Sequence, residues 1–267
     1  MIPEISASKV AGFIGLHKYQ DPTEIAYELL CKDLVAKTRV AEIEKEYNLR
    51  PYSKLVNEIL REWPIMDIVQ SGIKAAQQTT NVQAVLGEVE LQAGLVLDLR
   101  KDTYPKELRA RLVQEVRGAV SKQRGLKNEE AILDTYEAAK DVKVTERNTK
   151  TIKKDFGTFK LVGRCDGYVA AESRIVDSKD RTRLWPQVPL YDELQLRCYM
   201  NLYDAKESEL IERFPDRTTR HTKYMNTADK WDGIESAIRR GVDKLNAALH
   251  DEEELKRIIF ANGVAIQ

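Results

Sequence analysis

Two aspartates and a lysine in the stretch GRCDGYVAAESRIVDSKDR, residues 163–181, have the types and spacing needed for hydrolytic chemistry. Side chains alternate between the two faces of a β-strand, so Asp177 and Lys179 are expected on one face. A hairpin that turns near residue 171 would place Asp166 opposite Asp177. Facing carboxylates repel each other, and a divalent cation between them would turn that repulsion into ligation.

Oxygen ligands suit Mg²⁺, so Asp166, Asp177 and the backbone carbonyl of Ser178 form a candidate metal site. Lys179 would stay protonated beside two anions, where it could orient a nucleophilic water or stabilise charge on a phosphate. The alternative is a surface hairpin with solvated side chains, because Asp-x-Lys is also common by chance. The spacing therefore indicates a possible nuclease-like site and leaves the structural alternative open.

Three further motifs accompany this hairpin, each with an ordinary structural alternative. RGLKNEEA, residues 124–131, is expected to place Glu129 in the first turn of a helix, where a carboxylate also compensates the helix dipole. Gln195 and Tyr199 are four residues apart and share one face of a predicted helix, as amphipathicity alone would require. Near the start, Ser6 and Ser8 lie in ISASKV, where Ser6 could simply cap a helix.

The elements that must position these residues follow a helix–strand–helix order. Asp21 and Pro22 open a helical pattern, helices continue to Pro64, and residues 66–76 and, less clearly, 80–98 read as helical. Val, Thr, Ile, Phe and Tyr dominate residues 142–179, which predicts about three antiparallel strands. Helical spacing also marks the segments 129–140, 191–204 and 231–249. The fold class is therefore α/β or α+β, with a sheet flanked by helices.

Composition excludes several classes of protein. The 267 residues include 43 basic and 43 acidic ones, so no overall field favours nucleic acid or membrane. There is no apolar run long enough to span a bilayer and no visible secretory signal. Three cysteines without a CxxC pair and three scattered histidines argue against a disulfide framework or a histidine metal site. An intracellular, reducing compartment is expected.

A local excess of positive charge lies between residues 100 and 127, with nine basic and three acidic residues. It could be a solvated helix face or a patch that faces phosphates. Other basic residues could flank the cleft that would bind a nucleic acid: Lys150, Lys153, Lys154, Arg181, Arg183, Arg213, Arg217, Arg220 and Lys223.

Taken in order, ISASKV, GLHKYQDPTE, RGLKNEEA, GRCDGYV, IVDSK and QLRCYM resemble motifs of the PD-(D/E)xK nuclease superfamily. The closest similarity is to its YqaJ-type, lambda-exonuclease-like viral recombinase branch. The chain has Asp177 where Glu is frequent, and a long segment separates its first motif from RGLKNEEA.

The resemblance implies a central mixed β-sheet with an αβββαβ, restriction-endonuclease-like core flanked by helices. One nuclease domain would cover residues 1–267, with a mainly helical insertion at 31–120, the catalytic core at 121–205 and a C-terminal helical part at 206–267. Asp166, Asp177, Ser178 and Glu129 would bind Mg²⁺ or Mn²⁺, and Lys179 would be the catalytic lysine. Residues that would bind substrate are Gln195, Tyr199, Ser6, Ser8, Arg124, Arg181 and Arg183.

The implied activity is metal-dependent hydrolysis of DNA, more as an exonuclease than an endonuclease, in viral or phage recombination or replication. A single-strand-annealing protein is a possible partner, no membrane partner is expected, and the oligomeric state stays open. The sequence also leaves open an RNA endonuclease of the same fold, a non-catalytic nucleic-acid-binding module, and a helical interaction protein.

Overall fold

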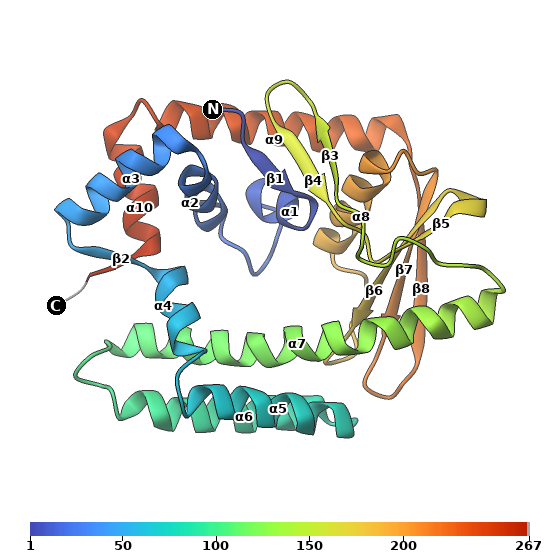
Figure 1. Ribbon diagram of the computed structural model, residues 1–267, viewed down its shortest axis with the longest axis horizontal. Coiled ribbons are helices and arrows are strands. Elements are labelled where there is room, and N and C mark those ends of the chain that lie inside the picture. Colours follow the sequence, from blue (N-terminus) through green and yellow to red (C-terminus); the bar gives the residue numbers. More distant parts are fainter. Residues whose placement is uncertain (266–267) are drawn as a thin grey trace.

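The first long helix begins where the sequence predicts. Asp21 accepts a hydrogen bond from the backbone N–H of Thr23 at 2.8 Å, and Pro22 occupies the first turn. The computed structural model, which describes residues 1–265, has the expected mixed α/β class (Figure 1). Its helices are α1 (Val10–Phe13), α2 (Pro22–Lys32), α3 (Leu34–Glu46), α4 (Tyr52–Ile59), α5 (Ile65–Gln78), α6 (Val82–Asp98), α7 (Lys106–Lys140), α8 (Leu190–Leu202), α9 (Ala228–Ala248) and α10 (Glu252–Asn262).

The strands form three sheets among the described residues. A four-stranded mixed sheet has the order β5-β6-β7-β8, in which only the β6–β7 pair is parallel and α8 provides the crossover. A second sheet has the order β1-β4-β3, and β2 pairs with β9. The strands are β1 (Glu4–Ser6), β2 (Leu49–Pro51), β3 (Ile152–Asp155), β4 (Lys160–Gly163), β5 (Gly167–Val169), β6 (Arg174–Asp180), β7 (Glu207–Arg213), β8 (Thr219–Met225) and β9 (Gly263–Ala265).

Strand β6 lies between two helices and contributes to a core on each face. Val176 belongs to a cluster with Ile132 and Leu133 of α7, whereas Ile175 belongs to a larger core that includes Leu196 of α8. Because side chains alternate along a strand, the odd-numbered residues of β6 face α8 and the even-numbered residues face α7. This alternation decides which side chains meet at the candidate site.

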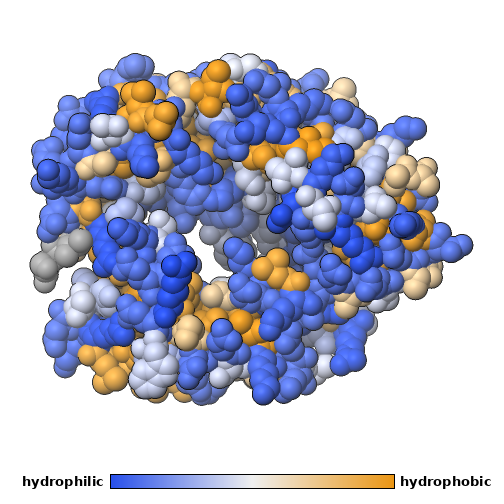
Figure 2. All heavy atoms as spheres, in the orientation of Figure 1, coloured by the Kyte–Doolittle hydropathy of each residue, from blue (hydrophilic) through white to orange (hydrophobic). Residues whose placement is uncertain are grey.

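A separate helical lobe forms around α4, α5, α6 and the first half of α7 (Figure 1). The N-terminal half of α7 contributes Leu112 and Val116 to the lobe's own core, while its C-terminal half packs on the sheet. With 35 residues, α7 is roughly 52 Å long. Figure 2 shows that the surface is hollowed between this lobe and the rest of the molecule, with mostly hydrophilic residues around the opening.

Two expectations about the elements were wrong. Residues 124–131 do not start a helix: Glu129 lies in the interior of α7, which continues unbroken from Lys106 to Lys140. The C-terminal part is not purely helical either, since β7 and β8 occupy 207–213 and 219–225 and complete the mixed sheet. The expected helices at 80–98, 191–204 and 231–249 are present as α6, α8 and α9. Among residues 1–265, no helix is both long and apolar enough to cross a bilayer.

Candidate active site

The hairpin that carries the two aspartates has the register predicted from the sequence. Gly167 pairs with Val176 and Val169 with Arg174, around a short 3₁₀ turn at residues 170–172. Ser173 closes the turn in the left-handed region, with φ of 50°. Asp166 immediately precedes β5, so the same register continues to Asp177.

The two strands are joined at this point by the Asp166 side chain. Asp166 Oδ2 accepts a hydrogen bond from the backbone N–H of Ser178 at 2.8 Å and lies 3.3 Å from Ser178 Oγ. Burial raises the pKa of Asp166, against the lowering effect of Lys179. The carboxylate is therefore fixed against β6 beside Asp177.

Asp177 and Lys179 form an ion pair on the same face of β6, as the alternation predicts. Lys179 Nζ lies 2.7 Å from Asp177 Oδ2, and the two side chains are 25% and 1% exposed. Burial, together with the charge of Asp166, raises the pKa of Asp177 to about 7 despite the nearby ammonium. Burial opposes the charge on Lys179, but Asp177 and Asp166 raise its pKa well above the usual range, so the lysine is a cation.

Glu129 approaches this group from α7. Its Oε1 accepts a hydrogen bond from Asn148 Nδ2, and its pKa is raised by burial and then by the charge of Asp177. The charge of Glu129 in turn contributes to the raised pKa of Asp166, and Glu129 comes from the middle of α7 rather than from a helix start.

Helix α8 contributes the predicted Gln195–Tyr199 pair. Gln195 Nε2 donates a hydrogen bond to the Tyr199 hydroxyl at 3.0 Å. Burial raises the pKa of Tyr199, with a further contribution from the charge of Asp177. A Cβ added at Gly163 would come within 2.8 Å of the Tyr199 ring, so this glycine allows α8 to pack closely over β4.

The carboxylates around Asp177 offer donor atoms for a cation. Within residues 1–265, however, no group of three or more His, Cys, Asp or Glu side chains is placed so that it could hold a metal ion. Each carboxylate is instead held through one oxygen: Asp166 by Ser178, Asp177 by Lys179 and Glu129 by Asn148. Asp177 Oδ1 is buried without a hydrogen-bond partner. That unpartnered oxygen and the hard carboxylate donors fit a cation such as Mg²⁺.

The remaining expected substrate residues lie elsewhere or are paired. Ser6 and Ser8 bond to each other at 3.0 Å, and no contact within the described chain joins them to Asp177. Arg181 is buried between Asp192 and Glu212 at 2.6 and 2.7 Å. Arg183 is exposed and lies 4.6 Å from the Trp185 ring centroid, whereas Arg124 pairs with Asp180 on the α7 face at 2.6 Å.

Several arginines of the basic stretch at 100–127 form ion pairs within the protein, whereas a patch that faces phosphates requires free cations. Its arginines make ion pairs within the helical lobe: Arg100 with Glu62, Arg109 with Asp98, and Arg117 with Glu90. Exposed lysines along α7, Lys106, Lys122 and Lys127, remain available to solvent. Fewer cations of this stretch are therefore free to contact phosphates than the sequence suggests.

An aromatic cluster beside the site was missed by sequence reasoning. His17 stacks on Tyr191 with ring centroids 4.1 Å apart, and Tyr19 packs edge-on against the same ring. Burial lowers the pKa of His17, and the charge of Asp192 opposes this effect. Burial raises the pKa of Tyr191, and the charge of Lys179 acts to lower it. The glycine-bearing segment GLHKYQ was visible, but no local pattern reveals a contact across so much sequence.

No family model matches the chain, and no curated protein matches it. Among solved structures, a phage-related exonuclease from Haemophilus somnus aligns with TM-score 0.40 and 17% identity over 48% of this chain and 73% of that one. An alkaline exonuclease from Laribacter hongkongensis aligns with TM-score 0.42 and 18% identity over 51% and 73%. Each of these alignments covers about half of this chain, at less than 20% sequence identity.

Proposed function

We propose that this protein is a Mg²⁺- or Mn²⁺-dependent nuclease that hydrolyses phosphodiester bonds of DNA, acting as an exonuclease. The observation that carries the proposal is the buried Asp177 carboxylate, which faces Asp166, pairs with Lys179 and keeps one oxygen without a partner. Like charges of two buried carboxylates repel each other, and the single positive charge of Lys179 balances only one of them.

Asp166 and Asp177 would hold the cation, and Glu129 and the Ser178 carbonyl would support it. When bound, a divalent ion polarises a phosphoryl oxygen and lowers the pKa of water. This group of oxygen donors matches the preference of Mg²⁺ for carboxylate and carbonyl ligands.

Lys179 acts as a positioning cation and not as a proton acceptor, because Asp177 and Asp166 hold it in the charged form. Its ammonium can donate hydrogen bonds to the attacking water and to the oxygens of the phosphate as negative charge develops. Tyr199, whose hydroxyl accepts a hydrogen bond from Gln195, would support the same cluster, since the charges of Asp177 and Asp166 contribute to its raised pKa after burial.

The exonuclease assignment and a role in viral or phage recombination rest on the ordered sequence motifs. The same motifs suggest a single-strand-annealing partner and an intracellular site of action. Exposed cations such as Lys122, Lys127 and Arg183 would contact the DNA backbone, so binding should weaken steeply with salt.

The decisive experiment incubates the purified protein with end-labelled linear DNA, circular DNA and RNA, with Mg²⁺, Mn²⁺ or a chelator. Degradation of linear duplex alone, abolished by the chelator and by Asp177→Asn, is the expected result. Asp232→Asn, an exposed aspartate on α9, is the matched control. Cleavage that survives Asp177→Asn would exclude the proposed site, and cleavage of RNA alone would exclude the substrate.

A further inference from the structure

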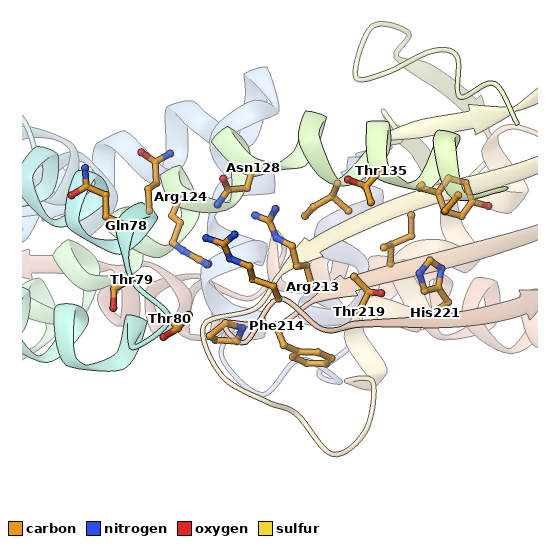
Figure 3. A pocket seen from close by; sticks show the side chains of 17 residues that line it. Gln78, Thr79, Thr80, Arg124, Asn128, Thr135, Arg213, Phe214, Thr219 and His221 are labelled. Atoms are coloured by element: carbon orange, nitrogen blue, oxygen red, sulfur yellow. The ribbon is translucent and has the colours of Figure 1, made fainter. Parts of the chain in front are cut away.

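A cavity of about 500 Å³ lies on the other face of the mixed sheet, between α7, the end of α5 and the β7–β8 hairpin. Figure 3 shows Gln78, Thr79 and Thr80 at one end, Thr135 and His221 at the other, and Arg124, Arg213 and Asn128 between them. The volume is that of an ordinary small-molecule site. No step of the proposed cleavage uses this cavity.

One part of the cavity is strongly cationic. Arg124, Arg213 and Arg217 line it, and no aspartate or glutamate is among its lining residues. Behind the wall, Asp180 pairs with Arg124 at 2.6 Å and with Arg213 at 3.1 Å. One carboxylate thus faces two buried or half-buried guanidinium groups.

Arg217 adds a third guanidinium, which is exposed and makes no ion pair within the described part of the chain. Arg124 is only 5% exposed; its Nη1 lies 2.6 Å from Asp180 Oδ2, and its Nε donates a hydrogen bond to the Ala76 carbonyl at 3.2 Å. Burial and the charge of Arg213 both act to lower the pKa of Arg124. An anion with several acceptor oxygens would satisfy these donors, and phosphate matches guanidinium geometry.

The other part of the cavity is apolar and aromatic. Ile132 and Tyr136 of α7 and Ile211 of β7, which belong to one buried cluster, line it. The His221 ring lies nearly parallel to Tyr136, with centroids 6.0 Å apart and an angle of 21°. Flat aromatic surfaces next to a cationic wall suit a ligand that carries both a ring and a phosphate.

The cavity backs directly onto the carboxylate site without being part of it. Asp180, behind the cationic wall, follows Lys179 in β6, and the lining residue Asn128 precedes Glu129 in α7. Asn128 Nδ2 donates to Asp180 Oδ2 at 2.8 Å. In β6, the consecutive residues Lys179 and Asp180 therefore lie on opposite faces of the sheet.

We propose that this cavity is a second ligand site that binds a nucleoside monophosphate, with the phosphate at the arginines and the base among the aromatic side chains. The site does not depend on the proposed nuclease activity. It is built from three arginines, of which Arg124 and Arg213 share the Asp180 carboxylate and Arg217 makes no ion pair in the described part of the chain, and from an apolar end.

Calorimetry on the full chain in the presence of a chelator tests this site apart from any metal-dependent binding at Asp177. The probes are dAMP, deoxyadenosine, inorganic phosphate and a 5′-phosphorylated oligonucleotide. We expect dAMP to bind more tightly than the other three. No binding of dAMP, equal binding of inorganic phosphate, or binding of the oligonucleotide alone would overturn the proposal.

Two variants locate the binding. Arg217→Asn removes one cation at a position with φ of 68°, which Asn tolerates, and should weaken dAMP binding roughly tenfold. Thr135→Trp fills the cavity from an exposed helix position and should abolish binding. Arg240→Asn, an exposed arginine on α9, and Asp177→Asn should leave affinity unchanged. Loss of binding in Asp177→Asn, or unchanged affinity in both cavity variants, would assign dAMP to another place.

Discussion

Asp166 Oδ2 accepts a hydrogen bond from the backbone N–H of Ser178 at 2.8 Å. This bond ties the residue before β5 to the strand that carries Asp177 and Lys179. A carboxylate that fixes strand register and also faces a second carboxylate has a structural and a chemical role. Substitutions at Asp166 therefore mix the two effects, whereas substitutions at Asp177 or Lys179 leave the Asp166–Ser178 hydrogen bond in place.

Lys179→Met should reduce DNA cleavage by about 10² to 10⁴, because it removes the cation from the carboxylate pair and keeps similar volume. The rate of release of labelled nucleotide from linear DNA measures the effect. Lys153→Met, an exposed lysine on β3, is the control and should cleave normally. Wild-type activity in Lys179→Met would remove the lysine from the mechanism.

Mn²⁺ should bind to the metal-free protein and raise its melting temperature. At a hundredfold excess over the dissociation constant, one site contributes about 2.7 kcal/mol of stability. Glu129→Gln should weaken Mn²⁺ binding, and Asp177→Asn should weaken it more, because Asp177 carries the unpartnered buried oxygen. Isothermal calorimetry measures both variants, and equal affinity in wild type and Asp177→Asn would contradict the assignment.

Glu209→Gln should destabilise the fold by about 1.5–3 kcal/mol, because it weakens one charged hydrogen bond of buried Arg174, which keeps Glu172 and Glu207 as partners. Burial acts to raise the pKa of Glu209, but hydrogen bonds from Tyr136 and His221, with the charge of Arg174, lower it overall. In acid the unfolded chain then binds the proton more readily. This stabilisation is complete above the ordinary pKa of glutamate and is lost as the pH falls through the lower folded value.

Urea unfolding at neutral pH and at pH near 3 measures the Glu209 effect. The wild type should lose stability in acid more steeply than Glu209→Gln. Glu253→Gln, an exposed residue of α10, should follow the wild type. If the two pH profiles were parallel, the buried network would not be the source.

Replacing Gly125 and replacing Gly163 with alanine should change the stability of the fold in opposite directions. Gly125 lies inside α7 with nothing within 4 Å of an added Cβ, so Gly125→Ala should stabilise by about 0.5–1 kcal/mol. Gly163→Ala would place its Cβ 2.7 Å from Leu202 and 2.8 Å from the Tyr199 ring, and should cost about 1–3 kcal/mol. Chemical denaturation measures both. Similar changes in the two variants would show that α8 does not pack on β4 as described.

Local patterns sufficed for the hairpin and for α8. Alternation along residues 174–180 and the four-residue spacing of Gln195 and Tyr199 depend only on neighbouring backbone geometry, and both were predicted. The Asp21 cap of α2 was likewise visible. The chemical roles assigned to these residues remain predictions.

Long-range charge pairing explains what was missed. β7 reads ESELIER, and its glutamates suggest a solvated segment. In the structure, Glu209 and Glu212 are buried beside Arg174 of β6 and Arg181, the residue after β6. The motif RGLKNEEA similarly suggested a helix start near Glu129, but α7 runs on through it because the two halves of the helix are packed on separate cores. Neither the ion pairs of Glu209 and Glu212 nor the packing of the two halves of α7 can be predicted from a short window of sequence.

Helix α7 is the only described element that belongs to both the helical-lobe core and the sheet-packed cluster. It carries Glu129 toward the carboxylates and Arg124 toward the cavity along one unbroken rod. Because α7 has no break between these residues, a movement of the α5–α6 hairpin that displaces α7 would shift Glu129 and Arg124 together, whether α7 rotates or translates.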